Sequence, residues 1–199
     1  MDTGTSQATP STPPAAPGPR RMVGHWPVLV GVATCALIAT DLAEGVELAK
    51  VLAGSAAVYL GAAAAGSRRA AWPMFALMTL VIIGCDLVSP GFEAAWAVLG
   101  LAVLFAGYAV VRAERHRRRP SRPLALQGAG MLGFAVVTIA ALYASTTVGS
   151  VLVALGLLAH AGWDVYHYRA RQVVATSLAE FCMVLDTGLA VVILALVAA

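Results

Sequence analysis

The feature of this chain that most restricts its fold is a series of long apolar runs separated by short polar segments. Each run has close to the ~20 residues that an α-helix needs to cross a hydrocarbon core of ~30 Å. The runs lack the strict alternation of apolar and polar residues that a transmembrane β-barrel requires. We therefore predict an all-α integral membrane protein, a bundle of seven transmembrane helices. The expected spans are 22–40, 46–65, 71–88, 94–111, 124–144, 150–168 and 173–199.

The rest of the chain leaves no room for a separate soluble domain. Hydrophobic residues make up 60% of the chain and charged residues only 12%, which is far from the composition of a soluble protein. The one long polar stretch, 1–21, is rich in Pro, Ser, Thr, Ala and Gly, so we expect a disordered cytoplasmic tail there. The following run has no clear small-residue cleavage site and is expected to be retained as the first span. The predicted organisation is a tail, 1–21, and one transmembrane domain, 22–199.

Arginine placement predicts the orientation of these spans. Arginines precede the first expected span and fill alternate loops, whereas the opposite loops carry mostly acidic residues. By the positive-inside rule the basic loops are cytoplasmic, which puts the N terminus inside and the C terminus outside. The arginines concerned are Arg20, Arg21, Arg68, Arg69, Arg112, Arg115, Arg117, Arg118, Arg119, Arg122, Arg169 and Arg171.

The same placement bears on partners and location. Because the basic residues are confined to membrane-flanking loops, the net charge of +3 does not indicate nucleic acid, and membrane lipids are the expected surroundings. The high ratio of Arg to Lys and the bias toward Ala, Gly and Val resemble the products of a GC-rich bacterial genome. We therefore expect a multi-pass protein of the bacterial plasma (inner) membrane.

Ionisable residues inside the last two expected spans mark a candidate site. His160, Asp164 and His167 have the spacing i, i+4, i+7 on the sixth span, which places them on one stripe of a helix. The seventh span adds Glu180 and Asp186. Charged groups in a bilayer are costly, so such a cluster is a functional-site hypothesis by default.

Depth along the helices predicts which of these residues meet. Counted from Arg171 at ~1.5 Å per residue, Glu180 lies at about 14 Å, level with His160. We therefore expect His160, Asp164 and Glu180 to converge in the cytoplasmic half of the bundle, with His167 nearer the boundary. Asp186 is six residues beyond Glu180, a rotation of about 120°, so only one of these two carboxylates can point at that spot.

This residue set predicts two kinds of chemistry. His160, His167, Asp164 and Glu180 are ligand types for a divalent metal such as zinc, and Glu180, Asp164 and Asp186 can serve as catalytic acids or bases without one. The favoured expectation is a membrane-embedded enzyme acting on a lipid or isoprenoid. The alternatives are a small proton- or cation-coupled transporter, a non-enzymatic membrane partner, and polar groups that only hold helices together.

Two further patterns are weaker. Glu47, Lys50 and Asp86 lie at the outer ends of the second and third spans, where we expect an ion pair between helices, the alternative being an entrance or second site. A faint repeat suggests a 3+1+3 parallel arrangement, with the fourth span as linker. It relates Tyr59, Gly61, Arg69 and Asp86 to His160, Gly162, Arg169 and Asp186.

The run His160-Ala-Gly-Trp-Asp164-Val-Tyr-His167, followed by Glu180-Phe-Cys182 and Asp186, resembles a pattern of small bacterial multi-pass membrane proteins with a His-x3-Asp-x2-His helix. The likeness covers the last two spans and implies no particular activity. In topology the chain is also similar to the seven-span hydrolase superfamily of progestin/adiponectin-type receptors, haemolysin III proteins and alkaline ceramidases. Those families hold zinc with an HxxxH pair in the last span and a His in the second, and this chain has neither.

Overall fold

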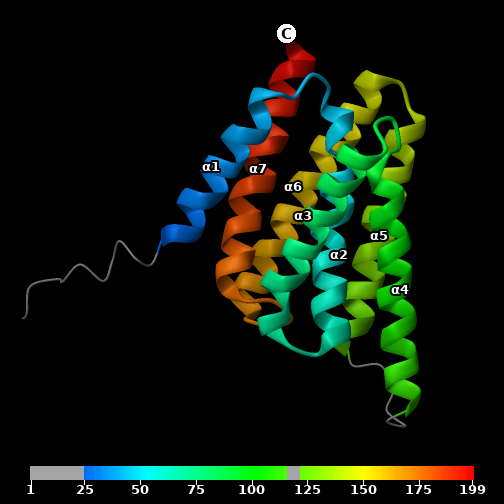
Figure 1. Ribbon diagram of the computed structural model, residues 1–199. Coiled ribbons are helices and arrows are strands. Elements are labelled where there is room, and N and C mark those ends of the chain that lie inside the picture. The colour runs from blue at the N-terminus through cyan, green and yellow to red at the C-terminus, as the bar shows by residue number, and fades with distance from the viewer. Residues whose placement is uncertain (1–24, 116–121) are drawn as a thin grey trace, which may run out of the picture.

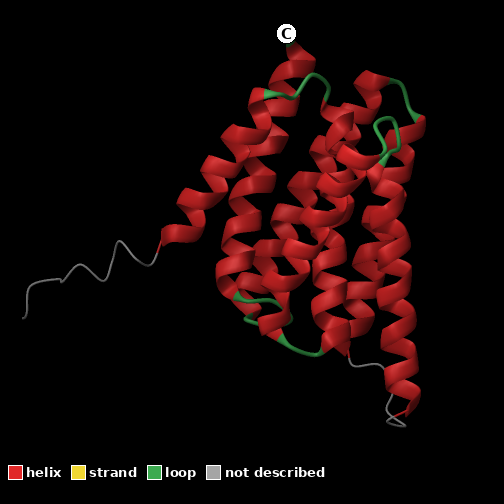
Figure 2. Cartoon of the chain, in the orientation of Figure 1, coloured by secondary structure: helices red, strands yellow, loops and turns green. Residues whose placement is uncertain are grey.

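The computed structural model describes residues 25–115 and 122–199, in which helices are joined by loops and there are no strands (Figures 1 and 2). The all-α prediction is confirmed. The predicted tail, 1–21, and the arginines at 117–119 lie outside the described residues. The α-helices are α1 (Trp26–Thr40), α2 (Ala49–Ala65), α3 (Ala71–Val88), α4 (Ala94–Arg115), α5 (Arg122–Tyr143), α6 (Thr146–Ala170) and α7 (Thr176–Ala198), with short 3₁₀ turns at Gly45–Leu48 and Arg68–Ala70.

Six of the described helices, α2 to α7, are long and apolar enough to cross a membrane, taking α2 and α3 together with the 3₁₀ turns before them. The exception is α1, whose 15 residues reach only about 22 Å, short of a ~30 Å core. It leans against α7 at one side of the bundle (Figure 1). The expected first span, 22–40, is therefore realised within the described residues as a short helix that begins at Trp26.

The centre of the bundle is α2, against which α3, α4, α5 and α6 all pack. Its residues are largely Ala and Gly, and 12 of its 17 residues are buried. Small side chains let neighbouring helices approach closely, which is how membrane helices gain packing energy. At Gly61 a Cβ atom would lie 2.9 Å from the ring of Phe105, so a larger residue at this position would force a neighbouring side chain to shift. The core of the protein is therefore an Ala-rich helix with one large polar side chain, Tyr59, in its middle.

Helices α6 and α7 form an antiparallel hairpin beside α2. Gly156 of α6 makes room for Leu52 of α2, because a Cβ at this position would lie 2.5 Å from Leu52 Cδ2. On the other face of α7, Gly188 leaves room for Cys35 of α1. The close packing of α2, α6 and α7 brings their buried polar residues together.

The two ends of the bundle differ in charge. One end of the bundle carries the α2–α3 and α6–α7 turns (Figure 1). There Arg112 donates to the carbonyl oxygens of Ala64 and Ala65 at 2.9 and 2.8 Å, and Arg68 and Arg171 line the same cavity. We call this the basic end. The opposite end carries the expected ion pair, with Lys50 Nζ 2.8 Å from Asp86 Oδ2. Glu47 does not join that pair; its carboxylate accepts from the backbone N–H of Glu44, 3.2 Å away.

Candidate metal centre

Three fully buried ionisable side chains meet between α6 and α7. His160 and Asp164 come from α6 and Asp186 from α7, and each has no exposed surface. His160 Nδ1 lies 2.8 Å from Asp186 Oδ2 and 3.4 Å from Asp164 Oδ2. The shorter contact is a hydrogen bond in which Nδ1–H donates to Asp186. We call these three residues the triad.

The hairpin geometry explains why these residues meet. His160 lies ten residues before the end of α6 and Asp186 ten residues after the start of α7, about 15 Å from the turn in both helices. Asp164 follows His160 by one helical turn, so it lies on the same face of α6. The triad is therefore set by the i, i+4 spacing on one helix and by equal distances from the turn on both.

Tyr59 of α2 completes the surroundings of the triad. Its hydroxyl donates a hydrogen bond of 2.5 Å to Asp164 Oδ1, and its ring meets that of His160 edge-on with centroids 5.4 Å apart. Phe134 of α5 packs against the same imidazole at 5.0 Å. Aromatic rings thus flank His160, and Asp164 is held in position by α2. Tyr59 is predicted from the sequence only as a repeat position, although a lone tyrosine in an Ala-rich span is a signal for a buried polar group.

Each member of the triad keeps one polar atom without a hydrogen-bond partner among the described residues. These atoms are His160 Nε2, Asp164 Oδ2 and Asp186 Oδ1. Leaving a buried polar atom unpaired costs about 1–3 kcal/mol, and more for a charged group. Two carboxylates beside one imidazole also leave an excess of negative charge if both acids are ionised. By itself the triad therefore lacks positive charge, which a bound cation would supply.

The spacing of the triad suits a metal ion. One potential ligand atom from each residue can be chosen so that all three lie within 4.8 Å of one another. Bonds of ~2.0–2.1 Å in a tetrahedral zinc site place neighbouring ligands about 3.3 Å apart, close to the 2.8 and 3.4 Å contacts of His160 Nδ1. One imidazole nitrogen and two carboxylate oxygens are donors for zinc and similar divalent ions. A metal ion held by Nδ1 would replace the proton on that nitrogen, and Nε2 of His160 would still be without a partner among the described residues.

His167 belongs to a different group of side chains. Its Nε2 lies 2.8 Å from Gln127 Nε2 of α5, and its Nδ1 lies 2.9 Å from the carbonyl oxygen of Trp163. Trp163 in turn donates its indole N–H to Gln127 Oε1 at 3.2 Å. We call His167, Gln127 and Trp163 the amide network. Because both ring nitrogens of His167 are engaged, the structure does not bring it to the triad as the expected ligand.

Gln127 was absent from the sequence interpretation. It is the only amide side chain within the expected spans, and its side chain is 2% exposed. Glycine at position 130 makes the network possible, because a Cβ atom there would lie 2.9 Å from the ring of Trp163. A single amide in an otherwise apolar helix was the available signal.

The expected convergence of Glu180 with His160 is wrong. Glu180 Oε1 lies 3.8 Å from His25 Nδ1, at the side of α7 that faces the start of α1, and the structure places Asp186 beside His160 instead. The depth count from Arg171 failed because α7 begins only at Thr176, so the residues of the turn add length without adding depth. The expectation that the two carboxylates face different directions agrees with the structure. Of the predicted residues, His160, Asp164 and Asp186 come together, whereas His167 and Glu180 lie elsewhere.

Compared with protein-family models, with curated proteins and with solved structures, this chain gives no match. The chemistry of the triad therefore rests on its own geometry.

Proposed function

We propose that this protein is a membrane-embedded enzyme that binds a divalent metal ion at His160, Asp164 and Asp186 and acts on a lipid or isoprenoid. The observation that carries the proposal is the set of three buried metal-ligand groups, each with an unpartnered polar atom, in the middle of membrane-spanning helices. Such groups in a bilayer are expensive and are retained for function. A metal ion bound there would polarise a substrate oxygen or activate a water molecule. Tyr59 would hold Asp164 in position through its hydroxyl.

The distribution of polar side chains favours an enzyme over a transporter. From the triad toward the basic end, the buried groups include Tyr59, His167 and Gln127. Toward the opposite end, the larger buried side chains of α6 and α7 are apolar: Val153, Leu157, Leu189 and Ile193. A transporter needs a polar route to both faces, whereas an enzyme needs access from one. The larger buried polar side chains thus lie toward the basic end, whereas toward the opposite end the buried polar groups are the small hydroxyls of Thr138 and Ser150.

The orientation follows from the charge of the two ends. We place the basic end in the cytoplasm, because positively charged loops are retained there, and the C terminus, at the opposite end, outside. The tail before α1 would lie on the cytoplasmic side with Arg20 and Arg21. In this arrangement a lipid substrate would reach the triad from the inner leaflet of a bacterial plasma membrane.

A cation-coupled transporter is the second candidate. It is favoured by the complete burial of the triad, because an ion could reach it only if helices moved, as they do in alternating access. Reconstituted vesicles distinguish the two candidates. Metal-dependent uptake of the ion itself would support transport, and metal-dependent turnover of lipid without uptake would support the enzyme.

Metal analysis of the full-length protein purified in detergent tests the proposal. We expect about one divalent ion per chain in the wild type and none in Asp186→Asn, because the variant loses a charged ligand. Asp86→Asn is the matched control, since it removes the same charge from the Lys50 ion pair outside the triad. Glu180→Gln should also keep its metal. A metal-free wild type that cannot be loaded with zinc or manganese, or equal metal loss in both Asp→Asn variants, would overturn the metal site.

A further inference from the structure

A cavity at the basic end has the charge and the donors of an anion site. It has a volume of about 510 Å³ and is lined by Arg68, Tyr168, Arg169, Arg171 and Thr176. Arg68 follows α2, Arg169 and Arg171 lie at the end of α6, and Thr176 begins α7. The cavity is about 15 Å from the triad along α6, so it is a second location in the molecule.

The arginines of this cavity have no acidic partner among the described residues. None of the ion pairs there includes Arg68, Arg169 or Arg171, and no carboxylate lines the cavity. The nearest acid along α7, Glu180, pairs with His25 instead. Guanidinium groups that line one cavity without a counter-charge attract an anion, and arginine forms paired hydrogen bonds with phosphate.

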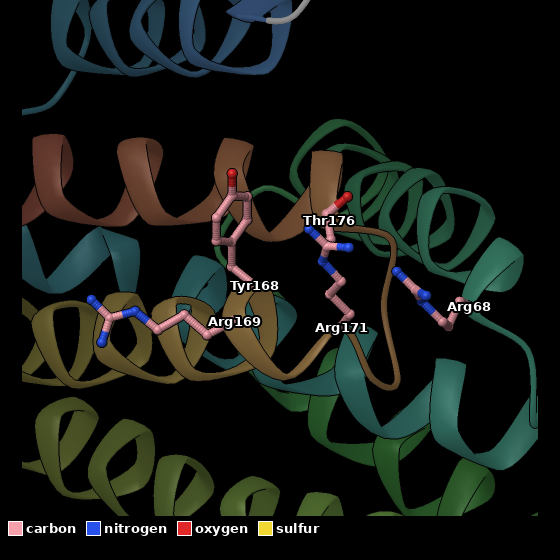
Figure 3. A pocket seen from close by; sticks show the side chains of 5 residues that line it. All are labelled: Arg68, Tyr168, Arg169, Arg171 and Thr176. Carbon is pink, nitrogen blue, oxygen red and sulfur yellow. The ribbon is translucent and has the colours of Figure 1, made fainter.

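Two further features of the cavity favour the binding of a phosphate group. Arg68 Nε donates to the carbonyl oxygen of Val174 at 3.1 Å, which fixes the guanidinium beside the turn and leaves its terminal nitrogens without a hydrogen bond to the described residues. The start of α7 carries no side-chain cap; the N–H groups of Leu178 and Ala179 donate to the carbonyl oxygen of Ala175, and those of Thr176 and Ser177 remain available to a ligand. In Figure 3 the Arg171 guanidinium lies close to Thr176, Arg68 approaches from the other side of the turn, and Arg169 extends away from both.

The backbone of the turn is held in an unusual conformation. Arg171 has φ of 50° and Val173 has φ of 67°, both in the left-handed region. For a β-branched residue such as Val173 this conformation is a genuine outlier and is strained. The turn that carries Arg171 into the cavity is therefore not the most relaxed connection between α6 and α7.

We propose that Arg68, Arg171 and Thr176 bind the phosphate group of an anionic ligand at the membrane surface, either a phospholipid headgroup or a soluble phosphate. A basic pocket between membrane helices at the cytoplasmic side is the expected form of a headgroup site. This site does not depend on the metal proposed for the triad, since it involves different residues at a different depth.

Binding of dioctanoyl phosphatidic acid to the full-length protein, measured by native mass spectrometry in detergent, tests this site. We expect Arg68→Gln/Arg171→Gln to bind at least tenfold more weakly than the wild type. The control is Arg69→Gln/Arg115→Gln, which removes the same charge from exposed positions at the basic end that do not line the cavity, and it should bind within twofold of the wild type. Thr176→Val should weaken binding by a smaller factor.

The source of the phosphate is decided in the same measurement. Displacement of the lipid by millimolar inorganic phosphate would show that the phosphate group alone is recognised; resistance to phosphate, with phosphatidylcholine binding more weakly than phosphatidic acid, would identify a lipid headgroup. If the double variant fails to fold, Arg171→Gln alone leaves the Arg68–Val174 bond intact and should still weaken binding several-fold. Equal weakening in the cavity and control variants, or no binding by the wild type, would overturn the proposal.

Discussion

Two groups of buried polar side chains share helix α6, and they differ in how completely their hydrogen bonds are satisfied. In the amide network the two ring nitrogens of His167, the amide of Gln127 and the indole of Trp163 all have partners. In the triad, three polar atoms have none among the described residues. Tyr59 touches both, through its hydroxyl to Asp164 and its ring to His167 at 4.9 Å. A satisfied network needs no ligand to explain it, whereas an unsatisfied one on the same helix indicates a binding site.

The largest expected difference between the two groups is in metal affinity. His160→Gln should lower the affinity for zinc by about 100-fold or more, because it removes the only imidazole ligand of the triad. His167→Gln should change the zinc affinity by less than about threefold, because His167 bonds to Gln127 and Trp163 and to no member of the triad. Isothermal titration of zinc into metal-free protein measures both. Equal losses in the two variants would show that the groups form one site.

For the free energy of unfolding, substitutions in the amide network should have a larger effect than substitutions in the triad. His167→Leu should lower the free energy of unfolding of the metal-free protein by about 2 kcal/mol, because it leaves a buried Gln127 donor without a partner. His25→Leu is the control, as the His25 side chain is 75% exposed. Reversible denaturation in detergent micelles provides the measurement. A His167→Leu protein as stable as the control would mean that the amide network adds nothing to the fold.

The two groups also differ in how far the sequence predicts them. The helices follow from the length of the apolar runs, and the pairing of His160 with Asp164 follows from their i, i+4 spacing. The identity of the α7 residue that faces His160 could not be predicted in this way. It depends on how many residues form the turn before Thr176, and hydrophobic runs locate the ends of helices poorly. Tyr59 and Gln127 enter because α2 and α5 pack against α6, which is a property of the assembled bundle and of glycines such as Gly130 and Gly156.

A substitution at Tyr59 can test the contact with the triad without changing the contact with the amide network. Tyr59→Phe keeps the ring against His167 and removes only the hydroxyl bonded to Asp164. We expect about a tenfold loss of zinc affinity, or about 1.4 kcal/mol, which is the size of effect that a group orienting a metal ligand has. Tyr168→Phe, at an exposed position on α6, is the matched control. Unchanged affinity in Tyr59→Phe would remove the hydroxyl from the metal site.

The smallest expected effect is the stability cost of removing a carboxylate from the triad. In the metal-free protein Asp186→Leu should change the free energy of unfolding by less than about 1 kcal/mol, since replacing a poorly satisfied buried charge by an apolar side chain is often neutral or stabilising. His160 Nδ1 would still face Asp164 Oδ2, 3.4 Å away, so the imidazole keeps a partner. With zinc present the wild type should gain stability and the variant should not, because only the wild type binds the ion. A loss of 3 kcal/mol or more in the metal-free variant would instead identify the His160–Asp186 bond as a structural link between α6 and α7. The triad would then stabilise the fold as the amide network does, and its unpaired atoms would no longer indicate a bound ligand.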